Sequence, residues 1–353
     1  MSIQTKPFGK LPSGEEITEY VLTNGHGVTA SFLDLGGIWR QMLVPDRSGR
    51  MDDVVLGYDT VEEYLADTYN FGALVGRNAN RIGGASLELG GVRYQLAVNS
   101  GVADNLHSGP NLYGCRKWQA QFVTMDGLDA LQLSLFSPDG DQGYPGNANI
   151  RVTYRLTEDN AVEIYYHMET DAETICNLTN HSYFNLDGHG APTAMEHEVM
   201  INAKRFSPAD QYSIPTGELA LVEGTPMDFT SRKPICRDLA ADYDQLTMAH
   251  GYDHNWVLDH PTDKLSLSAE VYAPDSGRKM EVWTTLPGVQ FYTGNYMDTE
   301  IHGKGGTKYG HRGGYCFETQ YYPDAIHHPE QPSPILRAGA SADSCTVYRF
   351  TSD

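Results

Sequence analysis

A glutamate and two histidines occur in segments that otherwise read as β-strands or turns. Glu318 follows Cys316 and Phe317 in the segment "GYCFETQYYPDA", and His181 interrupts the strand-like segment "TNHSYFNLDG". His107 lies in a tight loop, "NLHSGPN". Because histidine titrates near neutral pH and burial lifts the pKa of a glutamate toward that range, such a set can exchange protons with a substrate.

Each of these residues also has an ordinary structural explanation. Side chains alternate along a strand, so Glu318 shares a face with Cys316 and Gln320. Its carboxylate is therefore paired with another group, exposed on the outer face of the strand, or functional. A lone histidine such as His181 is more often a hydrogen-bonded structural residue than a catalytic one. Taken singly, neither position distinguishes the two explanations.

Planar hydrogen-bonding side chains accompany the three residues in other polar segments. They are Asn80 and Arg81 in "VGRNANRIGG", Asp253 in "GYDHNW" and Gln290 in "LPGVQFYTGN". Amide, carboxylate and guanidinium groups suit sugar hydroxyls, and aromatic rings suit the C–H faces of a sugar. The combined set indicates a carbohydrate site with proton-transfer chemistry.

Other kinds of chemistry lack the residues that they need. The chain has no G-x-S-x-G elbow, no P-loop and no H-E-x-x-H motif. His250 and His254 are four residues apart, but Gly251 between them indicates a loop rather than a helix face. The glycine-rich segment 303–308 lacks the P-loop spacing and is predicted to be a mobile loop. No cofactor and no metal are expected.

The elements that must position these side chains are mostly strands. Apolar and polar residues alternate in four segments, residues 131–136, 150–156, 161–170 and 345–350. Gly90 and Gly91 predict a hairpin with a two-residue turn within residues 85–96. The pattern predicts an all-β fold in which antiparallel sheets stack, with residues 1–353 forming a single domain.

Helix signals are few. Strands and helices do not alternate along the chain, so a parallel sheet is not expected. Thr60 and Glu63 have the spacing of a capping box, so a short helix is expected within residues 60–67. A second, weaker helix is expected within residues 238–246. Large β folds of this length form one unit, and a chain of this size buries a substantial core.

Charge and composition exclude several classes of partner. The formal net charge is −21, so a nucleic acid is not expected to bind, and no apolar run is long enough to span a membrane. The five cysteines are scattered and form no C-x-x-C motif, so a protein of a reducing compartment is expected. The N-terminal residues lack the apolar region of a signal peptide, so a cytoplasmic location is expected.

Seven segments together resemble the ordered motifs of one family, the aldose 1-epimerases or galactose mutarotases. They are "GRNANRI", "LHSGP", "SPDGDQGYPGN", "TNHSYFNLDG", "GYDHNW", "QFYTGN" and "FETQYYPDA". The resemblance extends from about residue 56 to residue 325. A single such motif is weak, but seven in the same order are highly specific.

The resemblance implies a β-supersandwich and a cofactor-free interconversion of the α and β anomers of free aldohexoses such as galactose and glucose. It implies that Glu318 is the general base on the anomeric hydroxyl and His181 the general acid on the ring oxygen. His107 would bind and polarise the same region. Sugar hydroxyls would be held by Asn80, Arg81, Asp253 and Gln290.

One departure from the family pattern concerns the loop after His107. The family often has two glycines there, and Ser108 occupies one of these positions. Because glycine permits positive φ and a close backbone approach, a serine there puts the finer sugar preference in doubt. The reaction itself is not affected by this difference.

Three other functions compete with this hypothesis. A non-catalytic sugar-binding protein would not need both Glu318 and His181. An epimerase of sugar phosphates would need a surplus of cationic side chains, whereas Arg81 alone is cationic in the matched set. A glycosidase would need a second carboxylate, for which Asp253 is the candidate. We expect a monosaccharide substrate, and a monomer or weak homodimer.

Overall fold

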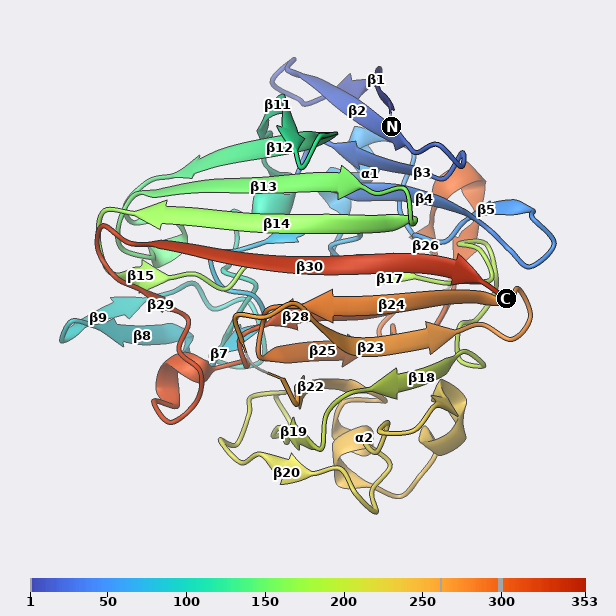
Figure 1. The fold of residues 1–353 in the computed structure, drawn as a ribbon. Coiled ribbons are helices and arrows are strands. Elements are labelled where there is room, and N and C mark those ends of the chain that lie inside the picture. The colour runs from blue at the N-terminus through green and yellow to red at the C-terminus, as the bar shows by residue number, and fades with distance from the viewer. Residues whose placement is uncertain (1, 261, 298–300) are drawn as a thin grey trace.

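A large antiparallel sheet occupies the front of the molecule in Figure 1. The structure is a computed structural model that describes residues 2–260, 262–297 and 301–353. The order of the nine strands is β11 (Gln119–Met125), β12 (Leu128–Ser137), β13 (Ala148–Leu156), β14 (Ala161–Thr170), β30 (Ser341–Ser352), β24 (Arg278–Thr284), β23 (Ser266–Tyr272), β18 (Glu198–Ile201) and β21 (Lys233–Pro234). The C-terminal strand β30 therefore lies inside the sheet, between β14 and β24.

A six-stranded antiparallel sheet lies behind the large one and contributes Glu318, Gln290 and Asp253 (Figure 1). Its order is β17 (Tyr183–Phe184), β28 (Tyr315–Gln320), β25 (Gly288–Tyr292), β22 (Asp253–Val257), β19 (Arg205–Ser207) and β20 (Ala220–Leu221). A third sheet contains β1 (Ser2–Lys10), β2 (Glu16–Thr23), β3 (Thr29–Leu33), β4 (Trp39–Pro45) and β5 (Met51–Asp53). The predicted all-β architecture is confirmed.

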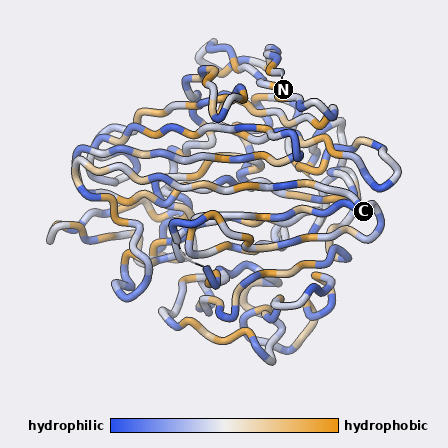
Figure 2. The backbone as a smooth tube through the Cα atoms, viewed as in Figure 1, coloured by the Kyte–Doolittle hydropathy of each residue, from blue (hydrophilic) through white to orange (hydrophobic). Residues whose placement is uncertain are grey.

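The alternation along β14 explains how the two larger sheets adhere. Val162, Ile164 and Met168 are fully buried and belong to one core cluster. The same cluster contains Phe291 and Phe317 of the six-stranded sheet. The intervening residues of β14 turn outward, and the alternation of colour along the front strands is visible in Figure 2. Burial of these apolar faces is the main force that holds the sheets together.

The predicted hairpin is confirmed. It consists of β8 (Ser86–Leu89) and β9 (Val92–Gln95), joined by Gly90 and Gly91. The φ angles of the two glycines are 56° and 79°. A type I′ turn needs positive φ at both central residues, and glycine adopts it without strain.

The first predicted helix is confirmed. It is α1 (Val61–Ala66), and it begins at Thr60 in a complete capping box with Glu63. Each of the two side chains accepts a hydrogen bond from the other residue's backbone N–H, which satisfies two donors that the helix itself cannot.

The second predicted helix is displaced toward the C-terminus. It is α2 (Asp244–Met248), whereas residues 238–246 were expected to be helical. The prediction is wrong for residues 239–243 because Tyr243 has an extended backbone, with φ of −144°. No helix in the described ranges is long and apolar enough to cross a membrane.

The glycine-rich segment 303–308 contains a short 3-10 helix, Lys304–Gly306, and is anchored by Lys304, while its mobility stays a prediction. Lys304 is buried, and its ammonium group donates to the carboxylate of Asp53 at 2.5 Å and to two backbone carbonyls. A buried cation requires such partners. They come from residues about 250 positions away, which a local reading of the segment does not reveal.

Candidate active site

The segment around His181 crosses between two sheets rather than forming the single strand that the sequence suggests. β16 (Thr179–Asn180) pairs with β6 (Leu74–Val75), and β17 then pairs with β28. His181 and Ser182 lie between these two pairings. The backbone N–H of His181 donates to the carbonyl of Ala73, which anchors the residue at the crossing.

The short polar residues beside His181 satisfy the buried backbone at this crossing. The Asn180 amide donates to the carbonyl of Gly72, and its Oδ1 accepts hydrogen bonds from the N–H and the hydroxyl of Ser182. Buried backbone groups need such partners where a strand pairing is interrupted. These residues therefore explain why a polar segment occurs among aromatic ones.

Glu318 occupies the middle of β28, opposite Gln290 of β25. Its side chain lies on the same face as Cys316, while Phe317 points to the core cluster. Glu318 is only 2% exposed, and its Oε2 has no hydrogen-bond partner among the described residues. A buried carboxylate oxygen without a partner is available to a ligand.

The loop that carries His107 sets the protonation of its imidazole. Nδ1 of His107 accepts a hydrogen bond from the backbone N–H of Asn80 at 3.1 Å, and the backbone N–H of His107 donates to the carbonyl of Asn80. Because Nδ1 is an acceptor, the hydrogen of the neutral ring is on Nε2. His107 is therefore a hydrogen-bond donor through Nε2.

Ser108 adopts the conformation for which the family often uses glycine. Its φ is 75°, and the residue is fully buried. The hydroxyl accepts a hydrogen bond from the N–H of Asn78 at 2.7 Å and donates one to the carbonyl of Asn78 at 3.0 Å. Ser108 thus ties two loops together and does not line the cavity described next.

Six of the seven predicted site residues line one cavity of about 350 Å³. They are Asn80, Arg81, His107, His181, Asp253 and Glu318. Nε2 of His181 is 3.6 Å from Oε1 of Glu318, and the rings of His107 and His181 meet edge to face at 5.3 Å. The cavity brings together residues that are up to 238 positions apart in the chain.

Gln290 lies behind the cavity wall rather than on it. Its amide donates to Oδ1 of Asp253 at 2.8 Å, and its Oε1 accepts from Gln320 at 3.3 Å. This arrangement orients the carboxylate of Asp253. A direct contact between Gln290 and a sugar stays a prediction.

Burial shifts the two central groups of the site in opposite directions. Loss of solvent raises the pKa of Glu318 to about 8, with a further increase from the charge of Asp253 and a decrease from Arg81. Loss of solvent lowers the pKa of His181 to about 4. Near neutral pH the Glu318–His181 pair therefore holds one proton, and in the empty site that proton is on the carboxyl.

Comparison with known proteins identifies the family. Residues 18–349 match the family model described as aldose 1-epimerase. The chain belongs to the aldose 1-epimerase family. Among its relatives, the galactose mutarotases of Bos taurus and Homo sapiens are 39% and 38% identical over 99% of each chain. The aldose 1-epimerase of Escherichia coli K12 is 35% identical over 97% of each chain.

Solved structures of the aldose epimerases have the same fold. An aldose epimerase homologue from C. elegans superposes with a TM-score of 0.84 at 31% identity, covering 94% of this chain and 98% of that one. A galactose 1-epimerase from Lactobacillus acidophilus gives a TM-score of 0.87 at 24% identity, covering 100% and 99%. The predicted family, supersandwich fold and isomerase class are confirmed.

The epimerase cavity contains a cluster that resembles a metal site but does not fit one. Nitrogen and oxygen atoms of His107, His181 and Glu318 lie within 4.8 Å of one another. A metal-bound histidine normally donates its second N–H to an acceptor. His107 instead accepts the N–H of Asn80 at Nδ1, so its Nε2 carries a hydrogen and has no lone pair for a metal.

Several residues of the epimerase cavity were missed by sequence reasoning. They include Thr68, Tyr69, Asn70, Leu106 and Tyr296. Tyr296 is half exposed and stacks on Tyr292 with an interplanar angle of 21°. Thr68–Asn70 directly follow α1, and their local sequence has no feature of a binding loop.

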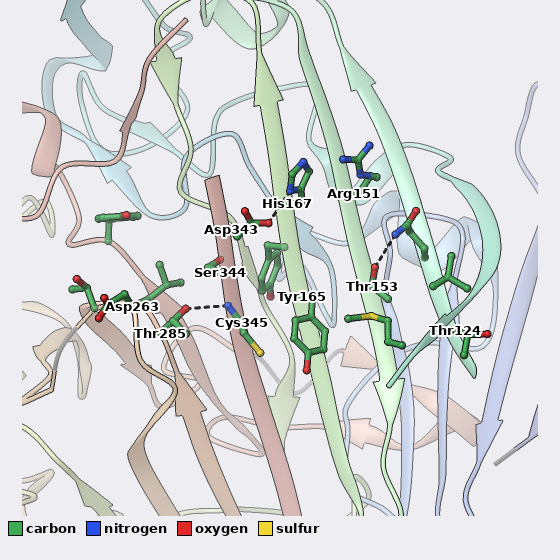
Figure 3. Close-up of a pocket in the computed structure, with 17 residues that line it drawn as sticks. Thr124, Arg151, Thr153, Tyr165, His167, Asp263, Thr285, Asp343, Ser344 and Cys345 are labelled. Atoms are coloured by element: carbon green, nitrogen blue, oxygen red, sulfur yellow. Dashed lines mark hydrogen bonds and ion pairs between the residues drawn. The ribbon is translucent and has the colours of Figure 1, made fainter. Parts of the chain in front are cut away.

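A larger hollow of about 790 Å³ lies on the outer face of the nine-stranded sheet and shares no lining residue with the candidate site (Figure 3). There the His167 ring bonds the partly exposed carboxylates of Asp343 and Glu169. Burial raises the pKa of the Cys345 thiol to about 12, so it is a poor nucleophile. The described residues of this hollow provide no buried acid–base pair, and the smaller cavity is the candidate active site.

Proposed function

We propose that the protein is a cofactor-independent aldose 1-epimerase that interconverts the α and β anomers of free aldohexoses such as galactose and glucose. The observation that carries the proposal is the buried Glu318–His181 pair, whose Oε1 and Nε2 atoms lie 3.6 Å apart at the wall of a sugar-sized cavity.

The reaction needs one base and one acid on the same hemiacetal. Glu318 as carboxylate removes the proton of the C1 hydroxyl, while protonated His181 donates a proton to the ring oxygen, and the C1–O5 bond breaks. Rotation about C1–C2 presents the other face of the aldehyde, and both transfers then reverse. Each positioned group contributes roughly 10²–10⁴-fold to the rate.

The proton count relates the charge of the buried pair to ring opening. Ionised Glu318 with protonated His181 carries the same number of protons as neutral Glu318 with neutral His181. The second state accompanies the open-chain sugar, and it is the state that the low-polarity site favours. Starting from the neutral pair, a proton must first move from Glu318 to His181, which creates both charges, and ring opening then removes them.

Neutral sugar hydroxyls suit the remaining groups of the cavity. The Nε2–H of His107 is a fixed donor, and the carboxylate of Asp253 is a fixed acceptor whose orientation Gln290 maintains. Asn80 and Arg81 supply further donors. Arg81 is the one cationic side chain among the described lining residues, which favours a free sugar over a sugar phosphate.

Polarimetry of freshly dissolved α-galactose, α-glucose and α-xylose, corrected for spontaneous anomerisation, tests the proposal. We expect Glu318→Gln to lose nearly all of the activity while still binding sugar, because glutamine keeps the shape but cannot accept the proton. Near-normal anomerisation by Glu318→Gln would sink the assignment of the base. Release of free sugar from an oligosaccharide would indicate a glycosidase instead.

We further propose that residues 1–353 form one domain that acts in the cytoplasm as a monomer or weak homodimer. The five cysteines are free, which supports a reducing compartment. Light scattering after size-exclusion chromatography at several concentrations measures the oligomeric state, and a stable complex larger than a dimer would contradict the proposal.

A further inference from the structure

The two ring nitrogens of His181 face two different side chains of the same strand. Nε2 lies 3.6 Å from Oε1 of Glu318, and Nδ1 lies 3.6 Å from Sγ of Cys316. The two residues are separated by one position on β28, so they project on the same face. The strand thus holds the imidazole at both ends.

Cys316 is a neutral thiol in this position. It is fully buried, and loss of solvent raises the pKa of its thiol well above the usual value, with a further increase from the charge of Glu318. The backbone pairs Cys316 with Tyr183 on one side and Tyr292 on the other, which fixes the main chain from which Sγ projects. A thiol sulfur is a weak hydrogen-bond acceptor.

We propose that Cys316 is a positioning residue whose sulfur accepts the Nδ1–H of His181 and thereby keeps the Nε2 lone pair directed at Glu318 and the sugar. The inference rests on the proposed function, because it assigns the nitrogen that exchanges the proton with the ring oxygen. Nδ1 keeps its hydrogen throughout the reaction, and only Nε2 gains and loses one.

The same reasoning gives the two histidines opposite tautomers. Nδ1 of His107 faces a donor, the N–H of Asn80, so Nε2 of His107 is permanently protonated. Nδ1 of His181 faces the sulfur of Cys316, so Nε2 of His181 is the atom that titrates. One ring is therefore a constant donor to the sugar, and the other is the acid and base.

A thiol orients the ring without adding charge. In a Ser-His-Asp triad the partner of Nδ1 is a carboxylate, which stabilises the imidazolium. Cys316 supplies a neutral partner, so protonated His181 remains a strong acid. That property suits a proton transfer to the weakly basic ring oxygen of a sugar.

The other groups around His181 do not replace this role. Tyr183 stacks on the ring face at 5.2 Å, and His107 meets the ring edge to face. Asp253 raises the pKa of His181 through its charge, and a backbone hydrogen bond within His181 itself acts in the same direction. That backbone bond gives the His181 ring a second acceptor. Removal of the Cys316 sulfur should therefore weaken the orientation of the ring and not abolish it.

The test compares Cys316→Val, which is similar in shape but cannot accept a hydrogen bond, with Cys316→Ser, which can. We expect Cys316→Val to lower kcat roughly two- to fivefold, because the lost hydrogen bond is a weak one, with KM nearly unchanged. Cys316→Ser should restore most of kcat. Circular dichroism verifies folding, and Cys316→Ala substitutes for the valine variant if that variant does not fold.

A second readout measures the tautomer directly. ¹⁵N spectra of histidine-labelled protein without sugar should show Nδ1–H at His181 in the wild type and a smaller Nδ1–H fraction in Cys316→Val. The His181 signals are assigned by their absence in His181→Asn. An unchanged tautomer or an unchanged kcat in a folded Cys316→Val would overturn the inference. An inactive wild type would instead contradict the proposed function, because the tautomer is measured without turnover.

Discussion

Glu318 and His181 hold one proton between them over a wide pH range, because the same desolvation raises the pKa of the carboxyl and lowers that of the imidazole. The pair is competent only with this single proton. With two protons the base is lost, and with none the acid is lost. At the residue scale, activity and pH dependence are therefore properties of the pair.

We expect kcat/KM for anomerisation to follow a bell-shaped pH profile with limbs near pH 4 and pH 8. Below about pH 4 His181 becomes protonated while Glu318 is still protonated, so the pair holds two protons. Above about pH 8 Glu318 ionises while His181 is neutral, so the pair holds none. Polarimetric rates with circular dichroism at each pH provide the measurement. A single limb near pH 6.5, the value of an ordinary histidine, would contradict the shared proton.

Glu318→Gln should make the protein more stable as well as inactive. Native Glu318 stays protonated up to about pH 8, whereas an unfolded glutamate ionises near 4.5. Between these values the native state binds more protons, so its stability falls as pH rises. Glutamine removes this loss, which is worth up to about 3 kcal/mol at pH 7 and almost nothing near pH 4.

Urea unfolding at both pH values measures the gain in stability, and Glu88→Gln at an exposed strand position is the matched control. Glu88→Gln should change the free energy of unfolding little at either pH. An equal gain for Glu318→Gln at pH 4 and pH 7 would show that ionisation of the buried carboxyl is not its cause.

The two histidines of the site lie at the ends of strands or between strand pairings, and not in the middle of a long strand. His181 lies where the chain leaves the pair β16–β6 and joins β28, and His107 lies just after β10 (Asn105–Leu106). Such points have backbone groups that no strand partner satisfies, so short polar side chains gather there. Ser108 is one of them, and its hydroxyl serves the backbone of Asn78.

Ser108→Ala should destabilise the protein more than Ser108→Gly. Both variants lose the two hydrogen bonds to Asn78, which costs roughly 1–3 kcal/mol for a buried backbone group left unpaired. Glycine recovers about 1 kcal/mol because it adopts a φ of 75° without strain. Chemical denaturation of both variants gives these differences.

The ratio of kcat/KM for galactose to that for glucose should be the same in both variants and in the wild type, because the hydroxyl of Ser108 faces Asn78 and not the cavity. A changed ratio in Ser108→Gly would show that the serine does set the sugar preference.

The whole molecule depends on a strand from the very end of the chain. β30 fills the middle of the nine-stranded sheet, while β1 forms the edge of the five-stranded one. Antiparallel sheets of this kind need pairing partners that are far apart in sequence, so folding requires nearly the full chain. The net charge of −21 favours solubility of such a large β protein.

Deletion of residues 341–353 should abolish cooperative folding, because it exposes the edges of β14 and β24 and opens the core. Deletion of residues 2–10 is the matched control, since β1 is mostly exposed and pairs on one side only. Thermal unfolding followed by circular dichroism distinguishes them. A cooperative transition in the C-terminal deletion would contradict the central role of β30.

Local patterns in the sequence were sufficient for the strands, the Gly90-Gly91 hairpin and α1, because alternation, turn residues and caps act over a few positions. They did not reveal the anchor of the segment 303–308 or the start of α2. Lys304 finds its partner at Asp53, and the extended backbone at Tyr243 interrupts the expected helix. Both outcomes depend on contacts or conformations outside the local pattern.

The sequence by itself determined which residue types the site contains and in what order, and the seven motifs were sufficient to place the chain in its family. Only the tertiary structure decided what each residue does there. It placed Gln290 behind Asp253, gave each histidine ring its own partner, and left Oε2 of buried Glu318 without a hydrogen-bond partner among the described residues. These properties depend on desolvation and on hydrogen bonds between strands that meet only after folding, so no local segment carries them.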